Sequence, residues 1–256
     1  MSSVVSLEIS GAVAKLQINR PEALNAINSD VIHSLEKHIL FLEKSTKIHL
    51  VLMSGAGEKA FVAGADIKEM QNLNSQEAAQ FSKFGTEVFL RLSALPQIVI
   101  AQIQGFALGG GLELAMAADI IVASQKARFG LPETSLGLIP GFGGTQKLAR
   151  RIGLARALEW MSTGDKYSAE EALRVGLVNH IWPSEELIPQ TEKLISQILK
   201  NGPEAIKAAK RIASTGFDLP LREACIFESQ QFGLQFGTSE MKEGVKAFLE
   251  KRSPQF

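Results

Sequence analysis

The chain of 256 residues is long enough to bury a full hydrophobic core, as one large domain or as one domain with an appendage. Its 27 basic and 27 acidic side chains balance, so no overall field directs the protein to nucleic acid or to anionic lipid. The single cysteine, Cys225, excludes an intrachain disulfide and a multi-cysteine metal site, and the sequence has neither an apolar run of membrane-spanning length nor a recognisable export signal.

The first predicted elements are two short strands and a helix. Apolar β-like runs at 4–9 and 12–18 are separated by Ser10-Gly11, which is typical of a β-hairpin. Ser29 is the expected N-cap of the helix that follows. One face of that helix is apolar and carries Ile32, Leu35, Ile39 and Leu42.

A third strand is expected at 50–53, followed by a run of small residues at 61–65. Asp66 suits the start of a short helix, where the helix dipole favours an anion. Ser75 is the expected N-cap of a longer helix that ends before Pro96.

The central stretch, 98–144, is the most informative part of the sequence. An apolar run at 98–103 predicts a buried strand, three glycines follow at 109–111, and good helix formers follow at 112–118. Main-chain N–H groups at the start of a helix have no partner within it, so this order of elements is typical of phosphate or oxyanion binding. The glycines match neither the dinucleotide fingerprint nor the P-loop, and a tight turn is the simpler explanation for an isolated glycine run.

Two carboxylates accompany the glycines. Glu113 follows them directly within an apolar sequence, and Glu133 follows Pro132 twenty residues later. Taken singly, Glu113 is explained as a capping acid and Glu133 as a solvated loop residue. If both are brought together in an apolar site, their pKa values separate, and the pair is able to perform acid and base chemistry on a carbonyl compound near neutral pH.

The last third of the sequence is predicted to be mostly helical. Helices are expected at 145–152 and 155–162, a short strand at 178–181, and helices from 185 to the end, with breaks near Gly202 and Gly216. Strands early and helices late favour a mixed α/β core with a helical appendage.

Other candidate sites are weaker. The four histidines show no metal-binding spacing and no serine-nucleophile elbow is present, so metal and serine hydrolase chemistry are not expected. Lys207, Lys210 and Arg211 form a basic stripe on a predicted helix. A solvent-exposed face is the first interpretation of this stripe, and phosphate binding is the second.

Five segments in order resemble the crotonase (enoyl-CoA hydratase/isomerase) family, and within it the short-chain enoyl-CoA hydratases. The resemblance covers essentially the whole chain. The segments are Asn19-Arg20-Pro21 with Ala23-Leu24-Asn25-Ala26, residues 61–70 (FVAGADIKEM), residues 105–115 (GFALGGGLELA), residues 129–133 (FGLPE) and residues 139–146 (IPGFGGTQ).

The resemblance implies a fold, an assembly and a substrate. The expected fold is a crotonase-like α/β spiral of repeated β-β-α turns over residues 1–195, with a helical region at 196–256 that packs a trimer. Two trimers are expected to form a hexamer. The implied substrates are coenzyme A thioesters, and no metal or redox cofactor, nucleic acid or membrane is expected to take part. The single cysteine and the lack of a recognisable leader favour a cytoplasmic enzyme.

The resemblance also assigns roles by position. The N–H groups of Ala65 and Gly110 would form the oxyanion hole. Glu113 would activate water for attack at C3 of a trans-2-enoyl-CoA, and Glu133 would supply the proton to C2 in a syn addition that gives a 3-hydroxyacyl-CoA. The main-chain N–H of Gly141 would help position the water. The adenine and pantetheine end of the substrate would lie against Ala63, Asp66, Ile67 and Lys68.

This reaction belongs to fatty acid β-oxidation or related acyl-CoA catabolism. Two positions depart from the best-known hydratases: Leu131 replaces a common glutamine, and Leu112 replaces a small residue or cysteine. Both positions are expected near the reacting centre, where they would affect acyl-chain preference. The alternatives are another reaction of the family on a CoA thioester, such as isomerisation or dehydration of a hydroxyacyl-CoA, and an RNA-binding relative that uses the basic stripe.

Overall fold

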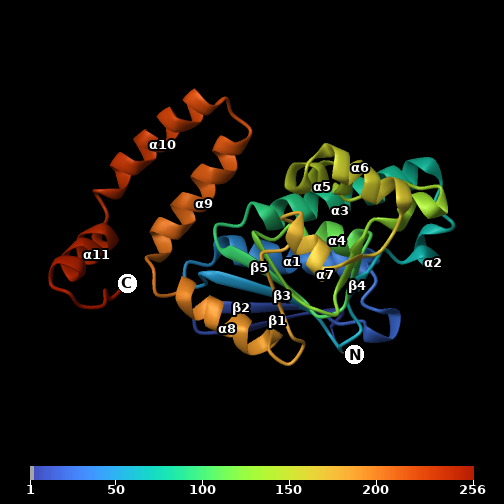
Figure 1. Ribbon diagram of the computed structural model, residues 1–256, viewed down its shortest axis with the longest axis horizontal. Coiled ribbons are helices and arrows are strands. Elements are labelled where there is room, and N and C mark those ends of the chain that lie inside the picture. The colour runs from blue at the N-terminus through green and yellow to red at the C-terminus, as the bar shows by residue number, and fades with distance from the viewer. Residues whose placement is uncertain (1–2) are drawn as a thin grey trace.

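The computed structural model describes residues 3–256 and shows a mixed α/β body from which the last helices extend as an arm (Figure 1). The larger sheet of the body consists of β1 (Val5–Ser10), β2 (Val13–Ile18), β3 (Leu50–Gly55), β5 (Ile98–Ile103), β7 (Ile120–Ser124) and β10 (His180–Trp182), in the order β1-β2-β3-β5-β7-β10. β1 pairs antiparallel with β2, which confirms the predicted hairpin, and the other pairings in this sheet are parallel.

A smaller sheet contains β4 (Ala60–Ala63), β6 (Phe106–Leu108), β8 (Arg128–Gly130) and β9 (Tyr167–Ser168), in that order. Each turn of the chain gives one strand to each sheet, because β3 leads to β4, β5 leads to β6, and β7 leads to β8. The predicted spiral of β-β-α turns is therefore confirmed.

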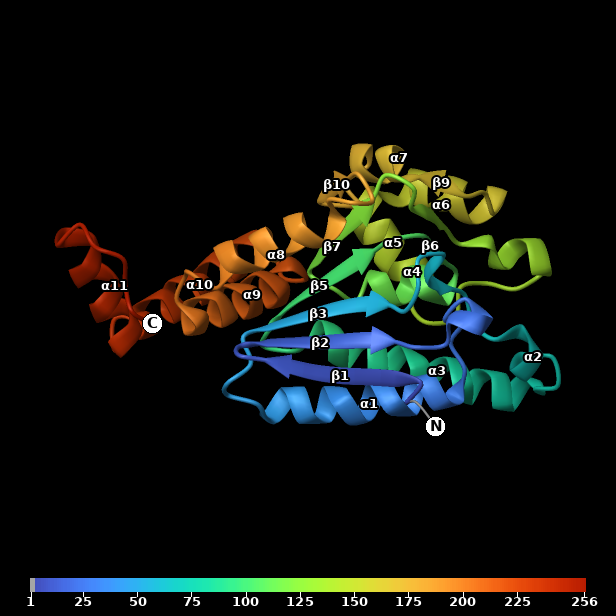
Figure 2. The same ribbon diagram turned by 90° about the horizontal axis from the view of Figure 1, so that it is seen from below.

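Helices pack around the two sheets of the body. Those of the body are α1 (Ser29–Lys44), α2 (Ile67–Met70), α3 (Ser75–Ser93), α4 (Gly110–Ala115), α5 (Gly144–Ile152), α6 (Leu154–Thr163) and α7 (Ala169–Arg174), with short 3₁₀ turns η1 (Pro21–Ala23) and η2 (Pro132–Leu136). Figure 2 shows α1 and α3 lying along one side of the larger sheet. The four predicted core residues of α1 are fully or almost fully buried there, which confirms its predicted apolar face.

Two predicted helix caps are wrong by one residue. Asn28, not Ser29, caps α1, and its side chain accepts a hydrogen bond from the N–H of Val31. Asn74, not Ser75, caps α3 and forms a capping box with Glu77. In both cases two residues that favour the N-cap are adjacent, and the one whose backbone remains extended is the one that caps the helix.

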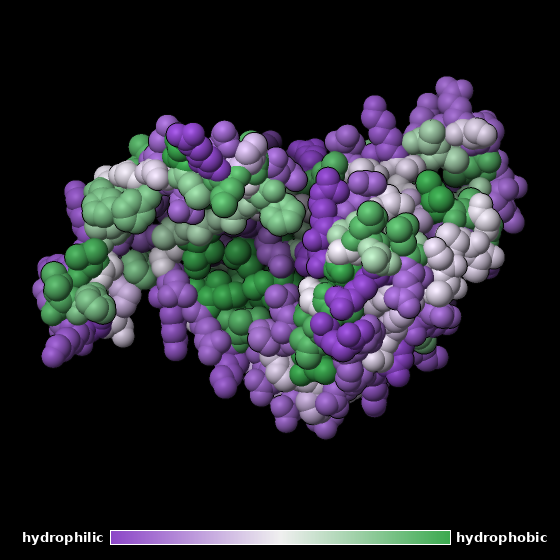
Figure 3. Space-filling model, turned by 45° about the horizontal axis from the view of Figure 1, so that its top comes forward, coloured by the Kyte–Doolittle hydropathy of each residue, from purple (hydrophilic) through white to green (hydrophobic). Residues whose placement is uncertain are grey.

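The C-terminal part consists of α8 (Leu187–Ile198), α9 (Pro203–Phe217), α10 (Leu221–Gln235) and α11 (Ser239–Leu249). α8 packs on the larger sheet, where Leu187 and Ile195 join an apolar cluster with Ile100. The arm beyond it exposes large apolar side chains, which form green patches in Figure 3. Those more than 60% exposed include Phe217, Leu221, Phe232, Leu234, Phe248 and Leu249.

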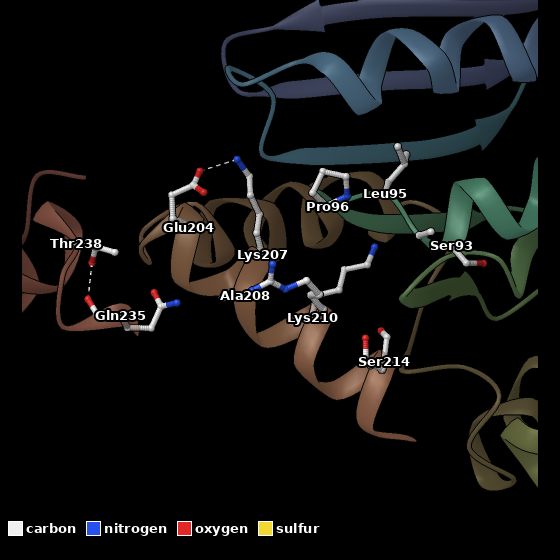
Figure 4. Close-up of a pocket in the computed structure, with 13 residues that line it drawn as sticks. Ser93, Leu95, Pro96, Glu204, Lys207, Ala208, Lys210, Ser214, Gln235 and Thr238 are labelled. Carbon is white, nitrogen blue, oxygen red and sulfur yellow. Dashed lines mark hydrogen bonds and ion pairs between the residues drawn. The ribbon is translucent and has the colours of Figure 1, made fainter. Parts of the chain in front are cut away.

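The basic stripe on α9 is not simply a solvent-exposed face, so the first interpretation is wrong for one of its members. The ammonium group of Lys210 donates to Asp119 Oδ2 at 2.6 Å and to the carbonyl oxygen of Gln97 at 2.8 Å, and only 7% of the side chain is exposed. Figure 4 shows Lys210 pointing from α9 toward the segment with Ser93 and Leu95, across a cavity of about 580 Å³. Lys210 therefore docks the first helix of the arm on the body.

Removal of the partner of this lysine should destabilise the fold. We expect Asp119→Ala to lower the free energy of unfolding by about 2–3 kcal/mol, because the buried ammonium of Lys210 loses its charged acceptor and the N–H of Val99 loses the same oxygen. Glu171→Ala is the matched control: it also removes a carboxylate acceptor, but the side chain of its partner Arg174 is 63% exposed, so the loss should stay below about 1 kcal/mol. Urea unfolding of both variants measures the difference, and equal losses would contradict the docking role of Lys210.

Candidate active site

One cavity of about 360 Å³ brings together segments that are far apart in the sequence. Its walls come from β4 and α2, from α3, from the start of α4, from η2 and from the loop before α5. The lining includes Ala63, Ala65, Ile67, Phe81, Gly110, Glu113, Glu133, Gly141 and Phe142. Both carboxylates singled out in the sequence therefore face the same space.

Glu113 lies on α4 and is 1% exposed. Its Oε1 accepts hydrogen bonds from the N–H of Phe142 at 2.8 Å and from the N–H of Gly144 at 2.6 Å, so the start of α5 holds the carboxylate. A Cβ on Gly144 would lie 2.7 Å from Oε1, which explains the need for glycine there. Oε1 is thus fixed, and no residue in the described chain donates to Oε2.

The pKa of Glu113 is raised to about 7. Burial is the main cause and the nearby Glu133 carboxylate adds to it, whereas the N–H groups of Gly144 and Phe142 and the charge of Lys147 act in the opposite direction. A glutamate with this pKa is partly ionised at neutral pH. It is therefore able both to accept and to release a proton under physiological conditions.

Glu133 stands on η2, directly after Pro132. Its carboxylate is close to the glycine turn, because a Cβ on Gly109 would lie 2.8 Å from Glu133 Oε1. Oε2 is buried and has no hydrogen-bond partner among residues 3–256. Burial also raises the pKa of this carboxyl. Glu133 therefore keeps one oxygen free for a ligand and retains its proton to higher pH than an exposed glutamate.

Two main-chain N–H groups at the cavity wall are free to bind a ligand. Gly110 is the first residue of α4, so its N–H has no partner within the helix. Ala65 forms a bridge with Ile27, but the bonds of that bridge use the groups on either side of Ala65. Neither N–H donates to another residue in the described part of the chain. Gly109 permits this geometry through its φ of +52°, which side chains rarely adopt.

The segment that carries Ala65 is held by Asn25 and Arg20, to which the sequence assigned no role. The buried Asn25 side chain donates to the carbonyl oxygens of Ala56 and Ala60, each at 2.9 Å, and accepts from the N–H of Arg20 at 2.9 Å. Arg20 in turn pairs with Asp66 at 3.0 Å. The φ of +59° at Asn25, uncommon outside glycine, shows how constrained this turn is.

The predicted CoA-contacting residues separate into two groups. Ala63 and Ile67 line the cavity, and Ile67 is half exposed at its mouth. Asp66 caps α2 by accepting from the N–H of Lys68, and it pairs with Arg20. The side chain of Lys68 is exposed on α2, and neither Asp66 nor Lys68 is part of the cavity lining among the described residues.

Gly141 also lines the cavity, and its role near the water stays a prediction. Leu112 and Leu131, the two departures from the family pattern, are fully buried in the main core and do not line the cavity formed by the described residues. Each directly precedes a lining residue, Glu113 or Pro132, so their place near the reacting centre stays a prediction. The apolar wall itself is built by residues such as Phe81, Leu138 and Phe142.

Among residues 3–256, no group of three or more His, Cys, Asp or Glu is placed to hold a metal ion. No helix in the described chain has the length and apolar character needed to span a membrane.

The sequence pattern of the enoyl-CoA hydratase/isomerase family matches residues 8–256. The chain is 45% identical over 248 residues to a short-chain-enoyl-CoA hydratase of Clostridium acetobutylicum, with 97% of this chain and 95% of that protein covered. It is 43% identical over 252 residues to a crotonyl-CoA hydratase of Syntrophomonas wolfei, with 98% and 97% covered.

Solved structures agree with the sequence relatives. An enoyl-CoA hydratase of Bacillus anthracis superimposes with a TM-score of 0.95 at 36% identity, and the match covers 99% of this chain and 98% of that one. The match therefore extends over nearly the whole length of both chains, the C-terminal helices included.

Proposed function

The chain belongs to the enoyl-CoA hydratase/isomerase family, and on this premise we propose that it is an enoyl-CoA hydratase, which adds water to a trans-2-enoyl-CoA. It is therefore a hydro-lyase. The observation that carries the proposal is that Glu113 and Glu133 line one cavity together with the unpartnered N–H groups of Ala65 and Gly110. This arrangement supplies a base, an acid and an oxyanion site to one thioester.

The two acids divide the proton transfers. Glu113, ionised and fixed through Oε1, accepts a proton from water through Oε2 while the water oxygen bonds to C3. Glu133 donates its proton to C2 on the same face, which gives the syn product. The pair then exchanges one proton through the product or solvent, so that Glu113 is ionised and Glu133 protonated for the next cycle.

The N–H groups of Ala65 and Gly110 stabilise the negative charge that develops on the thioester oxygen during the addition. Because they are fixed before the reaction, they bind the transition state more strongly than the substrate. Loss of one such donor typically costs about 3 kcal/mol. The N–H of Gly141 holds the water in this scheme, and Ala63, Asp66, Ile67 and Lys68 border the CoA portion.

The proposed enzyme needs no cofactor beyond the CoA of its substrate, since the two acids and two donors supply the chemistry of the addition. The apolar side chains exposed on the arm support association of residues 196–256 into trimers, with hexamers as trimer pairs. The proposed location is the cytoplasm, where the free, exposed Cys225 would stay reduced. RNA binding is disfavoured by the engagement of Lys210 with Asp119.

Hydration of crotonyl-CoA tests the function directly. The expected result is rapid loss of the ultraviolet absorbance of the conjugated thioester, with 3-hydroxybutyryl-CoA as the product. A deconjugated 3-enoyl product would point to isomerisation. If the protein binds acyl-CoA tightly but converts none of a series of 2-enoyl-CoA chain lengths, the proposal is wrong.

The pH dependence should show the raised pKa of Glu113. We expect kcat/KM to fall as the pH drops through about 7, because the carboxyl must be ionised to accept a proton and burial raises its pKa to that value. A profile that stays flat down to the ordinary glutamate pKa of 4.5 would contradict this assignment.

A further inference from the structure

The loop that leads into α5 rests on one face of α3. Ser82, Gly85, Thr86 and Phe89 are spaced by three or four residues, so they lie on the same side of this helix. The hydroxyl groups of Ser82 and Thr86 both donate to the carbonyl oxygen of Gly141. Two hydrogen bonds therefore hold the loop against α3.

Gly85 leaves a notch in this face. Glycine is a poor helix former, and alanine would favour an ordinary helical position in the interior of α3. A Cβ on Gly85, however, would lie 2.5 Å from Cδ1 of Phe142 and even closer to Cε1, well inside van der Waals contact. Phe81 and Phe89 pack against the same ring, each with centroids 5.4 Å away. The ring of Phe142 is thus seated in a space that only glycine leaves open.

Phe142 links this face of α3 to the reacting groups. Its N–H donates to Glu113 Oε1 at 2.8 Å. The opposite edge of its ring faces the start of α4, because a Cβ on Gly110 would lie 3.2 Å from Cδ2 of Phe142. One residue therefore contacts α3, the proposed oxyanion donor and the proposed base.

We propose that Gly85 is a positioning residue for hydration: it seats the ring of Phe142 and thereby places the main-chain N–H that holds the Glu113 carboxylate. This inference rests on the proposed function. Hydrogen bonds weaken steeply with distance and angle, so displacement of the ring propagates to the carboxylate through the backbone of Phe142. The other charged groups that act on Glu113 are Glu133 from η2 and Lys147 from α5. Substitution at Gly85 alters neither.

Gly85→Ala tests the seat. We expect kcat to fall by about tenfold or more, because a shift of about 1 Å in a reacting group is enough for such losses. The KM for crotonyl-CoA should change little, since the CoA portion binds elsewhere. The acid limb of the pH profile should move to higher pH, because a weakened donor stabilises the Glu113 carboxylate less.

Gly233→Ala is the matched control. Gly233 lies inside α10, and among residues 3–256 no atom beyond its chain neighbours and the backbone of its own helix is within 4 Å of the position that its Cβ would occupy. The same chemical change without a clash should leave kcat and the acid limb unchanged. A loss of kcat equal to that of Gly85→Ala would overturn the proposal.

Relief of the clash should restore function. In a Phe142→Leu background the smaller side chain leaves room for a Cβ, so Gly85→Ala should cost much less kcat there than in the wild type. Equal losses in the two backgrounds would overturn the proposal, and so would a loss of kcat without movement of the acid limb.

If Gly85→Ala fails to fold, as judged by circular dichroism, the double variant Ser82→Ala/Thr86→Val tests the proposal instead. This variant loosens the loop without a steric clash, and it should lower kcat and move the acid limb in the same direction. Unchanged kcat and an unchanged limb would then overturn the proposal.

A readout that needs no turnover separates this proposal from the proposed function. Carbon-13 NMR titration of the Glu113 carboxyl, assigned by its absence in Glu113→Gln, should give a higher pKa in Gly85→Ala than in the wild type and no change in Gly233→Ala. If the Glu113 pKa shifts in Gly85→Ala but the wild type hydrates no enoyl-CoA, the proposed function is wrong and the positioning role of Gly85 is supported. If the wild type hydrates crotonyl-CoA but the Glu113 pKa does not shift in Gly85→Ala, the function is supported and the role of Gly85 is wrong.

Discussion

Glu113→Gln is expected to lower kcat for hydration by about 10²-fold or more while acyl-CoA binding is retained. The amide oxygen still accepts the two hydrogen bonds from Phe142 and Gly144, so the local structure is preserved. An amide, however, does not accept a proton from water. Stopped-flow absorbance with crotonyl-CoA and calorimetric titration with a saturated acyl-CoA measure the two effects separately.

The same substitution should stabilise the protein at alkaline pH. The pKa of Glu113 is raised from 4.5 to about 7 by folding, so the wild type loses stability as the pH rises through this interval and the buried carboxyl ionises. Gln does not titrate and escapes this loss. The difference in melting temperature, variant minus wild type, should therefore be larger at pH 8 than at pH 5. A full hydration rate in the variant, or a melting difference independent of pH, would contradict the role of Glu113.

Glu133→Gln should also reduce hydration by about 10²-fold or more, but for a different reason. Glu133 carries the proton destined for C2, and its buried Oε2 has no hydrogen-bond partner within residues 3–256. The exposed Glu159, on α6 and outside the cavity, provides the matched control Glu159→Gln, which should retain the wild-type rate.

Exchange of the C2 proton distinguishes the two acids. A saturated thioester such as butyryl-CoA has no double bond to hydrate, so exchange of its C2 proton in deuterated water requires only the oxyanion donors and the group near C2. Glu133→Gln should abolish this exchange, whereas Glu113→Gln should retain it. The reverse pattern, measured by proton NMR, would show that the roles of Glu113 and Glu133 are interchanged.

Local sequence patterns predicted most of the secondary structure correctly. The Ser10-Gly11 hairpin, the apolar face of α1 and the strand–glycine–helix order around Gly109 all depend on residues within a few positions of one another, and the structure confirms each. Local patterns did not, however, decide which of two adjacent residues caps a helix. Asn28 and Ser29 both favour an N-cap, and backbone geometry rather than residue preference selects Asn28.

The pairing of Lys210 with Asp119 is a contact that local sequence patterns do not predict. These residues are 91 positions apart, and the sequence around Lys210 offers only a basic stripe, which has the same appearance on a solvated helix and on a docked one. Gly85 is a second case. A single glycine inside a helical pattern gives no sign of the ring that occupies its place, because Phe142 comes from another segment.

The sequence alone therefore determined the family, most strands of the larger sheet and most helices, and it singled out Glu113 and Glu133, because these follow from motifs and from periodicity over short spans. It did not locate β7 or the strands of the smaller sheet, β4, β6, β8 and β9, because runs of five residues or fewer carry little periodicity. Only the tertiary structure decided which groups act on each acid. The N–H groups that hold Glu113 come from 29 and 31 residues away, and burial, which raises the pKa of both carboxyls, is a property of the packed cavity. Contact across the fold depends on three-dimensional distance, which the spacing of residues along the chain does not give.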